Sequence, residues 1–226
     1  MKLDRDDFIS SFWSNNTELN VCPACDRERS DKIDDKVYDD ADHFLPKSKY
    51  PFLYLHPFNL FPLCMYCNRS FKGDRDMVDD NNNAPLLNIF HPYKRTALEK
   101  LNLQIYRDQN GVPKLGDFAD IDGMPSRRMT SLNRVFRLDE RWVRRLKTPK
   151  DDVIDLIIDM CARLNQKGQT DDINSDELRI ILEQAKDRVI KRLGKNPGYI
   201  VRKSYLDFAL LDDDEFEEIE RYFTPV

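Results

Sequence analysis

The residues best suited to chemistry are two Cys-x-x-Cys pairs and the polar stretch between them. Cys22 and Cys25 form the first pair, Cys64 and Cys67 form the second, and 38 residues separate the pairs. Zinc prefers four soft ligands in a tetrahedron, and two such pairs brought together supply four thiolates. A thioredoxin-like redox pair and ordinary buried cysteines are the alternatives, but neither predicts a second Cys-x-x-Cys. The spacing therefore predicts a structural zinc with no open coordination position for catalysis.

Oxygen and imidazole side chains form a second set of candidates. Asp42 and His43 are adjacent, Asn59 stands before the second cysteine pair, and Asn68 directly follows that pair. Carboxylate and amide oxygens suit magnesium or manganese, so Asp42 and Asn68 are the predicted ligands of a catalytic divalent cation. An imidazole beside such an ion can accept a proton from an attacking water, and His43 is the candidate for that role. Alternation along a strand would separate the Asp42 and His43 side chains unless the backbone bends.

Basic side chains around this stretch are candidates for phosphate contacts. Between His43 and Arg75 there are five basic residues and one acid, although the formal net charge of the chain is −5. The predicted nucleic-acid contacts are Lys47, Arg69 and Lys72. Lys49, on the same loop as Lys47, either contacts phosphate or only aids solubility. We interpret His56 as a surface residue, His91 as a packing residue, and Cys161, on the apolar side of a helix, as a core residue.

Prolines, glycines and periodicity predict the elements that must position these residues. Four prolines between Asp42 and Leu63 exclude a long helix and predict a strand, a loop and a second strand. A helix should follow from Cys64 to Lys72, with Gly73 ending it. A short helix is expected from Asp4 to Trp13. The stretch from Asp26 to Asp42, with eight acids against four bases, is expected to be a mainly solvated insertion that ends in a strand.

The second half of the sequence is expected to be mainly helical after one hairpin. The hairpin signal is "LNLQIYRDQNGVPKL", with its turn at Asn110 and Gly111. Residues 131–146 suit a single helix with one apolar side and one basic side, which is either a solvated surface or a nucleic-acid contact. The basic side consists of Arg134, Arg137, Arg141, Arg144 and Arg145. Another helix is expected over 151–164, and a further one opens at Asn174 with capping-box spacing and closes at Gly194.

The order of the candidate residues resembles the zinc-bearing branch of the HNH nucleases, whose catalytic core is the ββα-metal fold. The resemblance covers about Val21 to Tyr93, in the order Cys-x-x-Cys, Asp-His, Asn, Leu-Cys-x-x-Cys-Asn and Lys. It implies that His43 is the general base, and that Asn59 fixes the loop holding that base. It implies that Asn68 binds the catalytic metal with Asp42 as the companion ligand. The resemblance further implies hydrolysis of a DNA phosphodiester with one divalent cation, leaving a 5′-phosphate.

The sequence "DHFLPKSKYP…NLFPLCMYCN…K" is also similar to HNH proteins of bacterial anti-phage systems, such as the Septu nuclease subunit, which works beside an ATPase. This narrower resemblance implies a role in phage defence and an ATPase partner. The net charge of −5 points the same way, because an acidic chain neutralises few phosphates and should bind bare DNA weakly. The helices of the second half are the expected docking surface. The acidic stretch before Asp42 is not part of the motif.

These observations predict an α+β protein with a zinc-bearing HNH nuclease domain at 1–95 and a mainly helical domain at 96–226. Two alternatives stay open, a stand-alone restriction-type nuclease and a non-catalytic zinc ribbon that binds nucleic acid or protein. No stretch is long and apolar enough to span a bilayer, and the start "MKLDRDDFISSFW" carries acids where a signal peptide needs positive charge. The chain is therefore expected in the cytoplasm, without a membrane partner. Five cysteines in that reducing compartment argue against disulfides.

Overall fold

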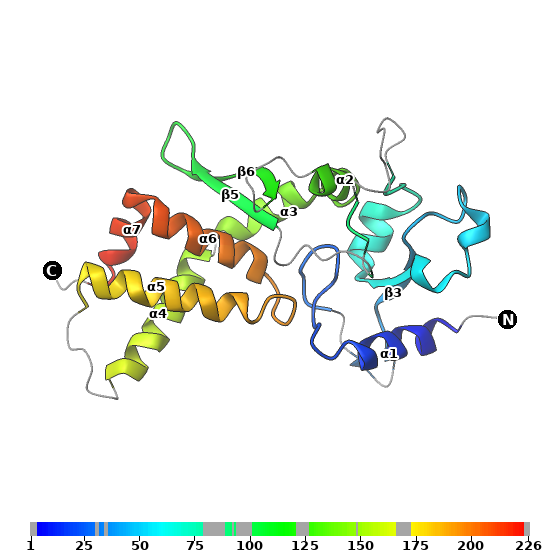
Figure 1. Cartoon of the computed structure of the whole chain (residues 1–226), viewed down its shortest axis with the longest axis horizontal. Coiled ribbons are helices and arrows are strands. Elements are labelled where there is room, and N and C mark those ends of the chain that lie inside the picture. Colours follow the sequence, from blue (N-terminus) through cyan, green and yellow to red (C-terminus); the bar gives the residue numbers. More distant parts are fainter. Residues whose placement is uncertain are drawn as a thin grey trace. The chain divides into compact units, whose positions relative to one another are not determined.

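The computed structural model describes residues 4–29, 32–33, 36–78, 89–91, 93, 101–120, 127–147, 149–165 and 173–223. These residues form an α+β structure of helices and two-stranded sheets (Figure 1). The chain divides into two compact units. Unit 1 comprises Met1–Asn102, Phe118–Glu140 and Gly194–Pro197, and unit 2 comprises Leu103–Asp117, Arg141–Leu193 and Gly198–Val226. The domain boundary predicted between residues 95 and 96 lies outside the described residues.

Unit 1 is built around two short antiparallel strands that are separated by a loop in the sequence. Its elements before the loop are α1 (Arg5–Asn15), β1 (Lys32–Ile33), β2 (Lys36–Val37) and β3 (Asp40–His43). α1 begins at Asp4, whose carboxylate accepts hydrogen bonds from the N–H groups of Asp6 and Asp7, so the predicted N-terminal helix is confirmed. β3 pairs with β4 (Leu60–Leu63), and His43 lies opposite Leu60. α1 packs against β3 and β4.

Turns fill the chain between β3 and β4, because its prolines exclude a longer helix. Two of these turns are η1 (Pro51–Leu53) and η2 (Pro57–Asn59), each beginning at a proline. After β4 the chain forms η3 (Tyr66–Lys72), a π-helical segment. The N–H of Gly73 donates to the carbonyl of Asn68 at 2.7 Å, and the φ of +47° at Gly73 ends the helix as expected. The predicted order of strand, loop, strand and helix is confirmed.

The acidic stretch 26–42 ends in strand β3, as expected, and two acids at the start of this strand are buried. Asp39 and Asp40 are buried. The indole N–H of Trp13 donates to the Asp39 carboxylate at 3.1 Å, and Arg69 donates two hydrogen bonds of 2.9 Å to the Asp40 carboxylate. The composition of the segment did not indicate this burial, because the partners of these acids come from α1 and η3, far away in the sequence.

The arginine-rich stretch 131–146 does not form the single helix that periodicity predicts. It forms three helical segments, namely α2 (Arg127–Phe136), α3 (Leu138–Val143) and η4 (Arg144–Lys147). The break occurs at Arg137, whose φ of +50° lies in the left-handed region. Arg137 pairs with Glu140, and Arg134 donates to the backbone carbonyl of Asp76 at 2.8 Å. A continuous basic face is therefore wrong, because the left-handed residue changes the helical phase.

Unit 2 contains a helical core and most of a hairpin. Its remaining elements are β5 (Leu101–Arg107), β6 (Pro113–Asp120), α4 (Pro149–Asn165), α5 (Ser175–Ile190), α6 (Tyr199–Leu211) and α7 (Asp213–Glu220). The predicted hairpin and capping box are confirmed: Gly111 turns with a φ of +74°, and the side chains of Asn174 and Glu177 exchange hydrogen bonds with each other's N–H. The buried core of unit 2 draws residues from all four α-helices. No helix among the described residues is long and apolar enough to cross a membrane.

Candidate functional site

The four predicted zinc ligands meet in one buried cluster of unit 1. The Sγ atoms of Cys22, Cys25, Cys64 and Cys67 all lie within 4.8 Å of one another. A regular tetrahedron with zinc–sulfur bonds of about 2.3 Å has sulfur–sulfur edges of about 3.8 Å. The Sγ atoms of Cys25 and Cys64 lie 3.9 Å apart, which fits such an edge. This buried cluster can therefore hold a structural metal ion such as zinc.

The ionisation of the four thiols also fits a cation site. Burial raises the pKa of the Cys22 thiol, whereas hydrogen bonding from neighbouring thiols, that of Cys22 first, lowers the pKa of Cys64. The pKa of Cys25 is also lowered, first by its hydrogen bond with Cys22, and that of Cys67 is raised, so the four thiols do not all ionise together without compensating positive charge. A divalent cation would allow all four to ionise.

The candidate base His43 stands at the end of β3, against a tyrosine of the loop that follows. Its Nε2 lies 3.0 Å from the backbone carbonyl oxygen of Tyr54, and the two rings stack with centroids 5.0 Å apart. A carbonyl can only accept, so Nε2 carries the proton and Nδ1 keeps its lone pair. Burial lowers the pKa of His43, although the Tyr54 carbonyl and the Asp42 charge oppose that effect. The imidazole is therefore neutral near pH 7, as a base must be.

Asn59 holds the loop that carries His43 and its tyrosine partner. Its Oδ1 accepts from the N–H of Leu45 at 2.8 Å, and its Nδ2 donates to the carbonyls of Leu45 and Leu53, each at 3.1 Å. Leu45 lies two residues after His43, and Leu53 directly precedes Tyr54. The buried Asn59 amide thus joins both sides of the loop, an arrangement that suits the orienting role implied by the resemblance.

Asp42 and Lys72 form a buried ion pair beside this loop. Oδ2 of Asp42 lies 2.9 Å from Nζ of Lys72, whose side chain is 0% exposed. Among the described residues neither atom has a hydrogen-bond partner beyond this contact. Burial raises the pKa of Asp42, and the Lys72 ammonium lowers it. The predicted contact between Lys72 and phosphate does not fit this arrangement, because the ammonium does not reach the surface.

Asp42 and Asn68 suit a hard divalent cation by their chemistry. The incompletely satisfied carboxylate oxygen of Asp42 is the type of ligand that magnesium prefers. Asn68 is half-buried on η3, one turn before Lys72, so η3 presents both residues on about the same face. Among the described residues, no hydrogen bond involves the Asn68 side-chain amide. Asp42 and Asn68 thus offer oxygen ligands of the type such a cation binds, and in this structure Asp42 is paired with Lys72.

Comparison of the chain with protein-family models, with curated proteins and with solved structures gives no match.

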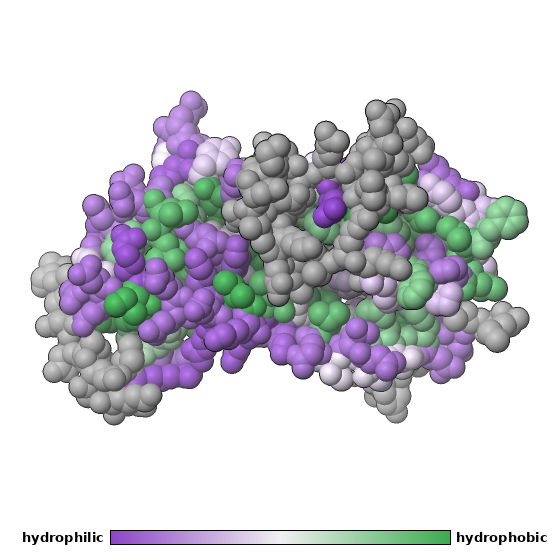
Figure 2. Space-filling view, viewed as in Figure 1, coloured by the Kyte–Doolittle hydropathy of each residue, from purple (hydrophilic) through white to green (hydrophobic). Residues whose placement is uncertain are grey.

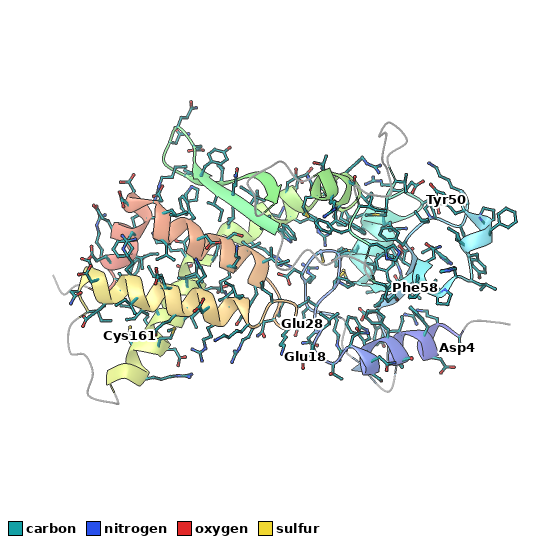
Figure 3. All side chains as sticks on the ribbon, in the orientation of Figure 1. Asp4, Glu18, Glu28, Tyr50, Phe58 and Cys161 are labelled. Atoms are coloured by element: carbon teal, nitrogen blue, oxygen red, sulfur yellow. The ribbon has the colours of Figure 1, made fainter. Side chains whose placement is uncertain are left out.

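The remaining sequence candidates lie in different settings. Arg69 is exposed but committed to Asp40 by two hydrogen bonds. Lys47 is exposed, with its Nζ 5.9 Å from the centroid of the Tyr54 ring, and can meet a phosphate. His56 is exposed, whereas the ring of His91 packs on Phe44, in line with the roles expected for them. Figure 3 labels Tyr50 and Phe58, which bound the loop beside His43, and Cys161, which is buried in unit 2.

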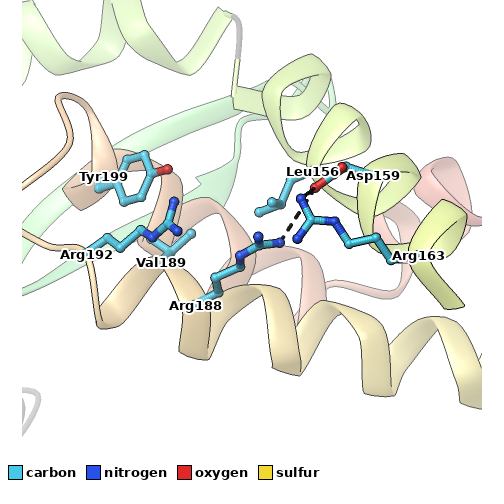
Figure 4. Close-up of a pocket in the computed structure, with 7 residues that line it drawn as sticks. All are labelled: Leu156, Asp159, Arg163, Arg188, Val189, Arg192 and Tyr199. Carbon is cyan, nitrogen blue, oxygen red and sulfur yellow. Dashed lines mark ion pairs between the residues drawn. The ribbon is translucent and has the colours of Figure 1, made fainter.

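A basic pocket in unit 2 contains none of the candidate site residues. It has a volume of about 220 Å³ and is lined by Leu156, Asp159, Arg163, Arg188, Val189, Arg192 and Tyr199 (Figure 4). Asp159 pairs with Arg163 at 2.8 Å and lies 3.8 Å from Arg188. This pocket is a small, charged depression between α4 and α5, so the residues of unit 1 remain the better candidate for chemistry.

Sequence reasoning missed two residues of the site. Tyr54 orients His43 through its carbonyl and its ring, and Asp40 binds Arg69. The acids of "DAD" at Asp40 and Asp42 are two apart on a strand and so share a face, where they meet two cations of η3. That spacing was a usable signal for Asp40. Nothing in the sequence indicated the carbonyl of Tyr54, since a backbone contact leaves no residue-type signal.

Proposed function

We propose that this chain is a divalent-metal-dependent endonuclease that hydrolyses phosphodiester bonds of DNA through an HNH-type ββα-metal site. The observation that carries the proposal is the setting of His43. Its Nε2 is held by a backbone carbonyl, its Nδ1 is left as a base, and the incompletely satisfied carboxylate of Asp42 lies next to it in the chain. A histidine with a purely structural role has no need of this combination.

Several residues of the chain have separate roles in the proposed hydrolysis. His43 Nδ1 accepts a proton from a water whose oxygen bonds to phosphorus, while the bond from phosphorus to the 3′ oxygen breaks and the phosphate stays on the 5′ end. Tyr54 keeps the imidazole in the tautomer that can accept this proton, and Asn59 keeps Tyr54 in place. The cysteine cluster fixes the start of η3 relative to the Cys22 knuckle, and so supports the position of Asn68.

Asp42 and Asn68 would hold the catalytic magnesium or manganese. A divalent cation bound there supplies positive charge that stabilises the charge developing on the phosphate. Asp42 would be the stronger ligand because a carboxylate can carry a negative charge, whereas the amide oxygen of Asn68 is neutral. Lys47 lies on the exposed side of the same loop, where it can meet a neighbouring phosphate.

The biological setting proposed here is phage defence in company with an ATPase. It rests on the resemblance of the motif residues to those of HNH proteins of anti-phage systems and on the net charge of −5, which gives the free chain little attraction for DNA. Co-purification of an ATPase from native lysate, with cleavage that depends on it, tests this part. Full cleavage by the isolated chain at physiological salt would favour a stand-alone nuclease.

The observation that favours a non-catalytic zinc module is the Asp42–Lys72 ion pair, because it neutralises Asp42 without a divalent ion. The deciding experiment compares His43→Ala with His56→Ala, a matched change of an exposed histidine on the same loop. We expect His43→Ala to abolish magnesium- or manganese-dependent nicking while zinc content and thermal unfolding stay as in the parent. His56→Ala should cleave normally. Equal cleavage by the parent and His43→Ala would refute the assignment of the base.

A further inference from the structure

Exposed aromatic and aliphatic side chains gather on the loop between β3 and β4 and at the start of η3. They are Phe52, Tyr54, Leu55, Phe58, Met65 and Tyr66. Phe52 is 99% exposed, and the other five are between 39% and 55% exposed. Figure 2 shows hydrophobic side chains at the surface of the end of unit 1 where this loop lies. Clusters of this kind usually mark a binding surface.

Residues 50–58, here called the aromatic loop, are held in place rather than extended freely into solvent. The carbonyl of Leu53 accepts from the buried Asn59 amide at 3.1 Å and from the N–H of His56 at 3.0 Å. At the start of the loop, the hydroxyl of Tyr50 donates to the Asp76 carboxylate at 3.0 Å. Tyr54 stacks on His43. The exposed rings are thus presented on a fixed backbone, which lowers the entropy lost when a ligand is bound.

The charge around the aromatic loop favours an anionic partner. The sequence from Phe44 to Gly73 contains no Asp or Glu, although the whole chain has 41 of them. The ammonium of Lys47 lies over the Tyr54 ring, and Lys49 lies 3.4 Å from the Asp76 carboxylate while half of its side chain stays exposed. Flat rings beside exposed ammonium groups fit a polymer that carries both flat bases and phosphates.

We propose that the aromatic loop is a stacking platform for unpaired nucleobases, so that the preferred DNA is single-stranded where it is cut. The inference rests on the proposed nuclease function and specifies its substrate. Only an unpaired base can offer its face to Phe52, because bases in a duplex already stack on one another. Tyr54, which belongs to the loop, stacks on His43. A nucleobase held on the loop would therefore bring its adjoining phosphate toward His43, the proposed general base.

The test is binding of labelled oligonucleotides to the zinc-containing full-length chain, at low salt and without added magnesium or manganese, so that nothing is cut. The probes are oligothymidylate, an abasic strand of the same length and a hairpin duplex. Phe52→Ala should weaken binding of oligothymidylate by about tenfold, the order expected for one stacked base. Phe52→Trp should retain binding, because it keeps a flat ring. Leu211→Ala, which removes an 85% exposed side chain from unit 2, should have no effect.

Binding of the abasic strand and of the duplex should be weaker than that of oligothymidylate and insensitive to Phe52→Ala. Equal binding of oligothymidylate by the parent and Phe52→Ala, or equal binding of the abasic strand, would overturn the proposal. So would self-association of the parent that Phe52→Ala abolishes, since the loop would then be a contact between copies. If the parent cuts DNA with magnesium but Phe52→Ala changes neither binding nor strand preference, the nuclease function stands and only this inference fails. Base-dependent binding with no cleavage, even with magnesium or manganese and the co-purified ATPase present, would leave the platform and refute the nuclease.

Discussion

Each unit of the molecule buries a carboxylate beside a basic side chain, and the two carboxylates differ in how fully they are satisfied. In unit 2, Glu215 is 2% exposed, pairs with Arg107 at 2.6 Å and accepts a hydrogen bond from the Tyr205 hydroxyl. In unit 1, Asp42 Oδ2 has its ion pair with Lys72 and no hydrogen-bond partner beyond it among the described residues. A satisfied buried charge suits a structural role, and an unsatisfied one is characteristic of a functional site.

The difference extends to the interiors of the units. Ten described residues with polar or charged side chains are buried, eight of them in unit 1, and only Ser204 and Glu215 in unit 2. Unit 2 has an apolar core drawn from four helices, with fewer buried polar groups beside it. Burying charged and polar groups costs free energy, so in unit 1 a bound metal should contribute a larger part of the folding free energy. Unit 2 should fold without one.

The largest expected effect is therefore metal removal, and it should be confined to unit 1. Cys64→Ala leaves three thiolates, so zinc should be lost and unit 1 should unfold, since a structural zinc contributes on the order of 10 kcal/mol. Cys161→Ala, a change of a buried cysteine in unit 2, should keep about one zinc per chain. Elemental analysis with hydrogen exchange resolved along the chain checks both. Protection of unit 1 amides that survives in zinc-free Cys64→Ala would refute the dependence.

The second effect tests the two buried charges directly. Lys72→Met leaves Asp42 buried without its ion pair and should lower the free energy of unfolding by about 3–5 kcal/mol. Arg107→Met removes the nearest cation from Glu215, which keeps Lys150 at 3.8 Å and the Tyr205 hydroxyl, so its cost should be smaller. Manganese should restore stability to Lys72→Met alone, because Asp42, and not Glu215, is the proposed metal ligand. Thermal unfolding with and without manganese measures the difference. No rescue of Lys72→Met, or equal rescue of both, would remove the distinction between the two carboxylates.

The third effect concerns the Tyr205 hydroxyl, which donates a hydrogen bond to the Glu215 carboxylate. Burial and then the bond to Glu215 raise the pKa of Tyr205 well above its ordinary value, so the hydroxyl stays protonated and donates. Tyr205→Phe removes one hydrogen bond to a charged group and should cost about 1.5–3 kcal/mol in urea unfolding. The control is Tyr222→Phe, at an exposed tyrosine, which should change stability by less than about 0.5 kcal/mol. Equal values for the two variants would show that Glu215 does not need the hydroxyl.

The sequence predicted those parts of the fold and site that depend on residue type at short spacing. The two cysteine pairs, the prolines between the strands and the glycine after η3 each act on their own segment, and the structure agrees with the expectations drawn from them. Asn59 was predicted from the resemblance to the HNH motif, and its amide bonds to the loop that it follows.

What the sequence could not predict depends on contacts between distant segments or on the backbone. The spacing in "DAD" indicated the face on which Asp40 lies but not its partner Arg69, which is 29 residues away, and the burial of Lys72 beside Asp42 was missed because it also depends on tertiary contacts. The helix break at Arg137 was missed because arginine is not a residue whose type indicates a left-handed φ. The carbonyl of Tyr54 carries no side-chain signal at all.

The smallest effect belongs to a feature that the sequence did predict, the capping box of α5. Asn174 Oδ1 accepts from the N–H of Glu177 at 3.0 Å, so Asn174→Ala leaves a helix N–H to water and should cost about 1 kcal/mol. Asn174→Asp preserves the acceptor and should stay within about 0.5 kcal/mol of the parent. Because α5 belongs to the core of unit 2, the loss should appear in exchange of unit 2 amides and leave zinc content and DNA nicking unchanged. If Asn174→Ala lowers the rate of DNA nicking as well as the stability of unit 2, the two units do not fold independently. The distinction between unit 1, which needs zinc to fold, and unit 2, which does not, would then be wrong.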